Sequence, residues 1–254
     1  MNESTLEIRT PDGVMPTFTA RPRDGGPFPV VIIYMDVWGV REELFDIARR
    51  VASVGYYCVV PDLYYRQGRV RNAFRNESNQ MISLELLSDE QKEIVRAPLR
   101  KLTDAMVVSD TDAILAHLDS DPAASKGPAG CIGYCMGGRH VFRVAAAYPD
   151  RFKACASLHG TNLATDAPDS PHRQMADCDC DLYCGFAQWD KFASPETVET
   201  LAHTLQGTKV NYRYEIHPDA DHGYALPDRD IHDRQAANRD WEIIFGMFRH
   251  RLDR

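Results

Sequence analysis

The feature that most constrains the fold of this sequence is the alternation of short, continuously apolar runs with amphipathic stretches. The run PVVIIYM at 29–35 is rich in β-branched residues, as expected for a strand that is buried on both faces of a parallel sheet. The stretch REELFDIARRVASVG at 41–55 has apolar residues at helical spacing and ends at a glycine. Further strands are expected at 56–64, 129–133, 153–160, 181–188 and 210–217, and further helices at 102–120, 136–149, 193–205 and 234–252. This order predicts an α/β fold, a mostly parallel sheet of about eight strands flanked by helices on both faces.

Two regions, the first 21 residues and the segment 64–101, depart from the simple alternation of strands and helices. The segments LEIRT (6–10) and MPTFTAR (15–21) flank Pro-Asp-Gly and alternate in polarity, which predicts a hairpin at the start of the chain. The segment 64–101 is about forty residues long, and connections of that length are usually functional. We expect it to carry a short helix near 88–97 and to lie as an insertion near the mouth of the active site. No repeat or linker divides the chain, so one domain is expected over 1–254.

Charge and hydropathy argue against several classes of protein. The 254 residues carry a formal net charge of −8, whereas a nucleic-acid binder needs a basic face, so no nucleic-acid partner is expected. The arginines of 64–75 form a local basic cluster, which fits a solvated loop as well as an anion-binding one. No signal peptide is recognised at the N-terminus, and no apolar run approaches the roughly 18 residues of a membrane span. The sequence therefore predicts a cytoplasmic protein with no membrane partner, and it leaves the oligomeric state open.

The cysteines indicate a reducing compartment. Their number is seven, and an odd number fits free thiols better than a disulfide framework. Cys178, Cys180 and Cys184 lie close together, but their spacing is not that of a zinc-binding pair, and the sequence around Cys184 is typical of a strand. We therefore expect neither a metal nor an organic cofactor.

The stretch GCIGYCMGGRH at 130–140 places Cys135 between glycines at minus two and plus two. It lies between an expected strand and an expected helix. This pattern, G-x-nucleophile-x-G in a strand–turn–helix context, is that of a nucleophile elbow, here with cysteine instead of serine. The helix N-terminus stabilises a thiolate, and the amide of Met136 points to where an oxyanion would form. The alternatives are an inert buried cysteine in a tight turn and a dinucleotide-binding loop, whose G-x-G-x-x-G fingerprint does not fit.

A nucleophile needs a base, and the base needs an orienting acid. In this architecture the acid and then the base follow the nucleophile in the chain, each just after a strand. Asp190 follows the expected strand at 181–188, and His222 follows the strand at 210–217. We therefore expect Asp190 to be the acid and His222 to be the base. The competing positions are Asp181, Asp219 and Asp221 for the acid and His140, His159 and His217 for the base.

Five segments resemble the dienelactone hydrolase family of the α/β-hydrolase fold, in the family's order. They are IIYMDVWGV (32–40), GYYCVVPDLYYR (55–66), GCIGYCMGG (130–138), GFAQWDKFASP (185–195) and DADHGYA (219–225). The resemblance implies a Cys135–His222–Asp190 triad and an oxyanion hole made by the backbone amides of Val37 and Met136. It also implies that Asp36, where the family usually has glutamate, contacts the resting nucleophile.

At the expected substrate site this sequence departs from the family's pattern. Members that open dienelactones carry an arginine four residues after the catalytic histidine, where this chain has Leu226; the nearest arginine downstream is Arg229. Lys92 and Arg96 are the candidates for a second family arginine. The residues expected to contact substrate are Trp38, Tyr65, Arg66, Lys92, Arg96, His159, Trp189 and Tyr224.

Together, these features predict a hydrolase that cleaves a small ester or lactone through an acyl-enzyme on Cys135. One alternative is a non-catalytic ligand- or protein-binding module on the same fold, which would need a broken triad. Another is a thiol redox protein using Cys135 with Cys131, although Cys131 lies on the strand below the elbow. A small-molecule substrate is the one partner that the sequence predicts.

Overall fold

The computed structural model describes residues 1–253 and contains one eight-stranded sheet with the strand order β1-β2-β4-β3-β5-β6-β7-β8. The strands are β1 (Asn2–Thr10), β2 (Gly13–Arg21), β3 (Val30–Tyr34), β4 (Tyr57–Pro61), β5 (Ala129–Tyr134), β6 (Phe152–Leu158), β7 (Asp181–Trp189) and β8 (Asn211–Asp221). The first two form the expected hairpin, and β2 pairs antiparallel with β4. All other neighbours are parallel, so the predicted α/β fold with a mostly parallel sheet is confirmed.

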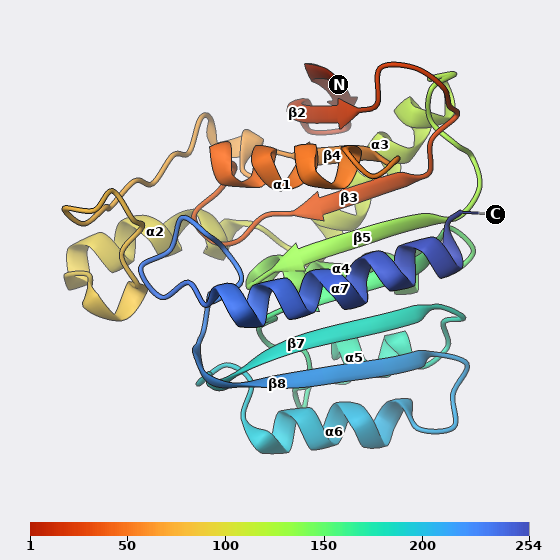
Figure 1. The fold of residues 1–254 in the computed structure, drawn as a ribbon. Coiled ribbons are helices and arrows are strands. Elements are labelled where there is room, and N and C mark those ends of the chain that lie inside the picture. The colour runs from red at the N-terminus through yellow and green to blue at the C-terminus, as the bar shows by residue number, and fades with distance from the viewer. Residues whose placement is uncertain (254) are drawn as a thin grey trace.

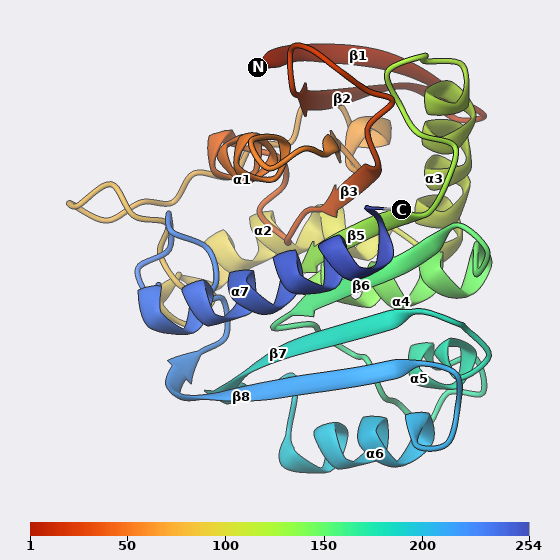
Figure 2. The same cartoon turned by 45° about the vertical axis from the view of Figure 1, so that its right-hand side comes forward.

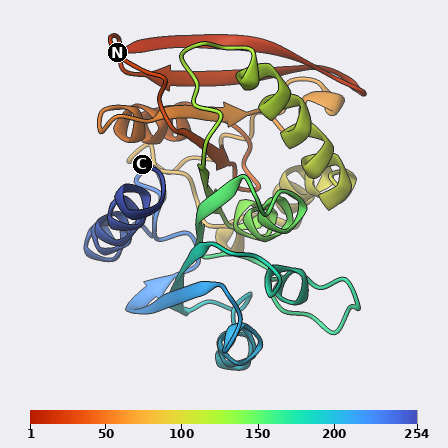
Figure 3. The same cartoon turned by 90° about the vertical axis from the view of Figure 1, so that its right-hand side faces the viewer.

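Helices cover both faces of this sheet. They are α1 (Glu42–Ala52), α2 (Asp89–Lys101), α3 (Asp104–Asp119), α4 (Met136–Ala147), α5 (Pro171–Met175), α6 (Pro195–Leu205) and α7 (Arg234–Arg251). Viewed along the strands, α1 and α7 lie on one face, and α3 and α4 lie on the other (Figure 3). The strands between them consist of buried residues throughout β3, β4 and β5, which is why these runs carry no polar alternation. Figure 2 shows the β1–β2 hairpin at one edge of the sheet and β8 at the other.

The segment 64–101 lies beyond the carboxyl ends of the central strands. In Figure 1, α2 lies at the end of the molecule to which the arrowheads of β3 and β5 point. The helix begins at a capping box formed by Ser88 and Gln91, and it runs four residues beyond the expected end at 97, through Pro98. A second small hydrophobic cluster packs this segment against the loop after β3; its members are Val37, Trp38, Met81, Leu87 and Val95. The long connection therefore covers the loop that carries Val37.

Across residues 1–253, none of the helices combines the length and the apolar character needed to cross a bilayer.

Candidate active site

Cys135 occupies a strained turn between β5 and α4. Its backbone has φ 56° and ψ −117°, a conformation that few non-glycine residues adopt, and its side chain is only partly buried. A Cβ on Gly133 would lie 2.0 Å from the carbonyl oxygen of Gly137, and a Cβ on Gly137 would lie 2.3 Å from that of Tyr34. Both glycines are therefore required by close backbone contacts. This is the geometry that presents a side chain above the carboxyl edge of a sheet.

Asp190 and His222 meet at the same edge of the sheet. Asp190 directly follows β7 and His222 directly follows β8, two neighbouring parallel strands. His222 Nδ1 lies 2.7 Å from Asp190 Oδ2, and the other carboxylate oxygen accepts the backbone N–H of Phe192 at 2.8 Å. The Phe192 ring packs against the imidazole, with the centroids 4.8 Å apart. The carboxylate is thus fixed from both sides and orients one nitrogen of the histidine.

The surroundings of His222 favour the charged form of its imidazole. Burial lowers its pKa, but the neighbouring Cys135 and the Asp190 carboxylate outweigh burial and raise the pKa to about 10. Its Nε2 atom is buried and has no hydrogen-bond partner within residues 1–253. An imidazolium beside a cysteine can stabilise a thiolate and later release its proton.

The loop after β3 lines the pocket together with Cys135, and α4 begins directly after Cys135. Met136 is the first residue of α4, so its amide is one of those that lack an intrahelical partner. Tyr64 donates its hydroxyl to the carbonyl oxygen of Val37 at 3.2 Å, which fixes the Val37 peptide beside the elbow. The pocket is small, with a volume of about 20 Å³. Its lining residues are Asp36, Val37, Trp38, Leu84, Glu85, Cys135, Phe192, His222 and Arg229. Leu84 and Glu85 come from the segment 64–101.

Asp36 is paired with an arginine. Arg41 donates to both of its carboxylate oxygens, at 2.7 and 3.0 Å, and the backbone N–H of Trp38 donates to Oδ1 at 3.1 Å. The opposite side of the same guanidinium donates to Asp228 at 2.7 and 3.1 Å. In the described part of the chain, the structure does not bring Asp36 into a hydrogen bond with Cys135. It uses Asp36 and Arg41 to join the loop after β3 to the loop that follows His222.

Four residues that line the pocket were not expected at the site: Leu84, Glu85, Phe192 and Arg229. Arg229 is the only cation among them. Only 5% of it is exposed, its guanidinium lies over the Trp38 ring at 5.3 Å, and its Nε atom has no hydrogen-bond partner within residues 1–253. None of its nitrogens forms an ion pair with a described residue. Leu226, in contrast, packs in the main hydrophobic core. The signal in the sequence was the position of Arg229 seven residues after His222.

Three of the residues expected to contact substrate lie in or beside the site. Trp38 lines the pocket, whereas His159 and Tyr224 are fully buried beside His222. Tyr224 donates its hydroxyl to Asp240 at 2.7 Å, and His159 packs edge-to-face on His222.

The remaining candidates are not among the residues that line the pocket. Tyr65 and Arg66 both donate to Asp110, on α3. Lys92 lies 3.7 Å from Asp89 on α2, Arg96 is exposed on the same helix, and Trp189 is 60% exposed at the end of β7.

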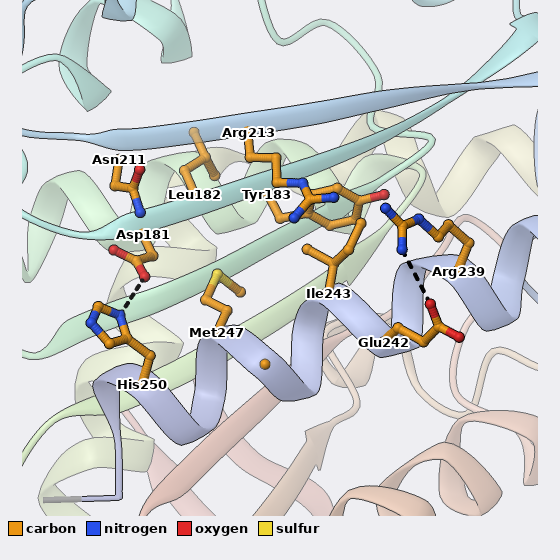
Figure 4. A pocket seen from close by; sticks show the side chains of 11 residues that line it. Asp181, Leu182, Tyr183, Asn211, Arg213, Arg239, Glu242, Ile243, Met247 and His250 are labelled. Carbon is orange, nitrogen blue, oxygen red and sulfur yellow. Dashed lines mark hydrogen bonds and ion pairs between the residues drawn. The ribbon is translucent and has the colours of Figure 1, made fainter.

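The competing bases and acids have other contacts. His217 Nε2 lies 2.7 Å from the buried Asp240, and His140 lies 3.5 Å from Asp104. Asp181 lies at the opposite end of β7 from Asp190. There its Oδ2 lies 3.2 Å from His250 Nδ1, beside a groove of about 370 Å³ lined by β7, β8 and α7 (Figure 4). This groove contains none of the three candidate triad residues.

No group of three or more histidine, cysteine, aspartate or glutamate side chains within 1–253 is arranged to hold a metal ion. Cys178, Cys180 and Cys184 are buried free thiols.

Comparison with known proteins places this chain in a protein family. A model described as "Dienelactone hydrolase family" matches residues 15–252. A protein of Methylorubrum extorquens named "Putative carboxymethylenebutenolidase" is 28% identical over 96% of this chain and 80% of its own length. The carboxymethylenebutenolidase of Rhodococcus opacus is 21% identical over 98% and 92%. A crystal structure from Klebsiella pneumoniae, titled "Putative Dienelactone Hydrolase", superposes with a TM-score of 0.83 at 24% identity, covering 97% of this chain and 98% of the other.

Proposed function

We propose that this chain, which belongs to the dienelactone hydrolase family, is a hydrolase that cleaves a small ester or lactone through an acyl-enzyme on Cys135. The observation that carries the proposal is the arrangement of His222, oriented by Asp190 at 2.7 Å, beside a cysteine at a strained strand–helix turn. A nucleophile, a base and an orienting acid are the minimum that acyl transfer requires.

The proposed reaction begins from a Cys135 thiolate paired with a His222 imidazolium. The Cys135 thiolate attacks the carbonyl carbon, and the oxyanion that forms is held by the amides of Val37 and Met136. The imidazolium of His222 then gives its proton to the departing alkoxide, so that an alcohol leaves and a thioester remains. Neutral His222 next takes a proton from water, and the hydroxide formed attacks the thioester. Breaking the carbon–sulfur bond releases the acid and restores the thiolate–imidazolium pair.

The pocket favours an ester or lactone that carries an anionic group. Burying a guanidinium without an acid is costly, and Arg229 is buried without an ion pair within residues 1–253 in the pocket that Cys135 and His222 also line. A substrate carboxylate would supply the missing partner. The curated relatives are carboxymethylenebutenolidases by name, which fits a carboxylated lactone.

The nucleophile assignment is tested with p-nitrophenyl acetate and iodoacetamide. Of the seven free cysteines, six are buried and Cys135 alone is partly exposed, so brief alkylation should label Cys135 first. We expect hydrolysis to stop in proportion to the labelling of Cys135, followed by mass spectrometry. We also expect Cys135→Ala to lower the rate by at least about 1,000-fold. Hydrolysis that survives full labelling of Cys135 would refute the proposal and favour a binding module.

A further inference from the structure

His159 is the buried side chain that touches both partners of the proposed thiolate–imidazolium pair. It follows β6, the strand beside β5, and none of its surface is exposed. Its Nδ1 atom accepts the backbone N–H of Cys135 at 3.1 Å. Its ring packs edge-to-face against the ring of His222, with centroids 5.1 Å apart and an interplanar angle of 72°. One imidazole therefore contacts the nucleophile's backbone and the base's ring.

The hydrogen bond to Cys135 determines the tautomer of His159. An Nδ1 atom that accepts a hydrogen bond carries no proton, so the proton of the neutral ring is on Nε2. Burial, and then the positive charges of His222 and Arg229, hold the pKa of His159 well below its usual value, which keeps the ring neutral. The Nε2 atom is buried without a hydrogen-bond partner within residues 1–253. Within residues 1–253, the Nε2–H donor of His159 is therefore unsatisfied, while Nδ1 keeps its hydrogen bond to the Cys135 amide.

Backbone strain accompanies this contact on both sides. His159 has φ 39° and Cys135 has φ 56°, so two residues joined by a hydrogen bond both adopt positive φ. The same short segment also holds the elbow through Leu158, whose carbonyl oxygen accepts from the Cys135 amide, and Thr161, whose amide donates to the Cys135 carbonyl. Strain of this kind persists only where the surroundings over-determine it, and it concentrates at functional sites.

We propose that His159 is a positioning residue that fixes Cys135 relative to His222 by accepting the elbow amide at Nδ1 while its ring packs on the base. This inference rests on the proposed function and adds a residue to it. A nucleophile displaced by about 1 Å can lose roughly 100-fold in rate, so a single lost acceptor at the elbow is expected to reduce acylation.

A matched pair of variants separates the hydrogen bond from the packing. His159→Asn keeps an acceptor near the position of Nδ1, and asparagine tolerates positive φ. His159→Phe keeps an aromatic ring but has no acceptor. We expect the asparagine variant to hydrolyse p-nitrophenyl acetate within about 5-fold of the wild type. We expect the phenylalanine variant to lose about 100-fold in kcat, with KM within about 2-fold, and to be alkylated more slowly at Cys135.

The outcomes distinguish a failure of this inference from a failure of the proposed function on which it rests. Asparagine and phenylalanine variants of equal activity, whether both high or both low, would overturn the role of the acceptor. If Cys135→Ala and His222→Ala remain active, the proposed function itself fails. Should the phenylalanine variant not fold, ¹⁵N NMR of the wild-type imidazoles decides: an unprotonated Nδ1 and a protonated Nε2 on His159 support the inference, and a protonated Nδ1 refutes it.

Discussion

Arg229 is a buried cation that lines the same pocket as the candidate nucleophile and forms no ion pair within residues 1–253. Its neighbour Arg41 shows the alternative arrangement, since that guanidinium is saturated by Asp36 and Asp228. On the proposed function, Arg229 is the positive group that binds the substrate's anionic group, while Arg41 joins the loops that carry Asp36 and Asp228.

Replacing Arg229 should therefore affect anionic substrates selectively. We expect Arg229→Met to lower kcat/KM for a carboxylated ester, such as p-nitrophenyl hemisuccinate, by about 10- to 100-fold, because hydrogen bonds to charged groups contribute about 1.5–3 kcal/mol. The rate with neutral p-nitrophenyl acetate should change by less than about 3-fold.

Arg234 on α7 is exposed and provides the matched control, with Arg234→Met expected to behave as the wild type with both esters. An Arg229→Met enzyme that loses equal activity toward both esters would contradict the substrate class proposed above.

At the scale of residues, the sequence predicts the position of a side chain best when that side chain directly follows a strand. Cys135, Asp190 and His222 each directly follow a parallel strand, so the order of strands and turns brings them to one edge. Arg229 reaches the pocket along a loop whose path depends on distant side-chain contacts. Asp36 was expected at the nucleophile, and only the structure reveals that Arg41 engages both of its oxygens.

Between elements, Asp104 at the start of α3 joins that helix to α4. Its carboxylate accepts from Arg139 at 2.6 Å and from Arg143 at 2.7 Å, and His140 lies 3.5 Å away. Burial raises its pKa, but the hydrogen bonds and positive charge from α4 outweigh burial and hold the pKa well below the usual range. Because α4 begins at the elbow, this contact also anchors the helix that carries the Met136 amide.

The depressed pKa predicts how stability depends on pH. A carboxylate whose pKa is lower in the folded state stabilises the fold above its unfolded pKa of about 3.9, and this contribution disappears as the pH falls through the folded value. We expect Asp104→Asn to lower the free energy of unfolding by about 2 kcal/mol at pH 7, and the difference from the wild type to shrink below about pH 4. Urea denaturation at pH 7, 5 and 3.5 measures it.

A control for this experiment lies at the other end of α3. Asp119 is 52% exposed and lies 3.5 Å from Arg151, so Asp119→Asn should change stability by less than about 1 kcal/mol at every pH. A loss for Asp104→Asn that stayed constant down to pH 3.5 would indicate lost packing and not a lost charge.

For the molecule as a whole, hydrophobic periodicity accounts for the sheet and its helices but not for the paths of the long connections. The strands at the centre are continuous apolar runs, and each was expected from its sequence. The five-residue helix α5 was not expected, because so short a stretch contains too few residues to show a period. The path of the segment 64–101 was equally inaccessible, since residues more than 140 positions away hold it in place.

Hydrogen bonds between residues 81–83 and 228–230 join the segment 64–101 to the loop that follows His222. Met81 exchanges backbone hydrogen bonds with Asp228 and Asp230, at 2.7 and 3.1 Å, and Ser83 donates its amide and its hydroxyl to the Asp230 carboxylate at 2.9 and 2.6 Å. Leu84, directly after Ser83, lines the pocket. The segment 64–101 is thus held by the loop that carries Arg229.

Removing this carboxylate should loosen the segment without unfolding the sheet. We expect Asp230→Ala to raise trypsin cleavage at the exposed arginines of 69–75 by about 10-fold, because two lost hydrogen bonds cost about 1–2 kcal/mol of local stability. The melting temperature should shift by less than about 3 °C, since the core is untouched. Asp150→Ala, an exposed carboxylate beyond α4, is the matched control. Equal cleavage of both variants would mean that backbone pairing at Met81 alone holds the segment, and that the Ser83–Asp230 contact does not.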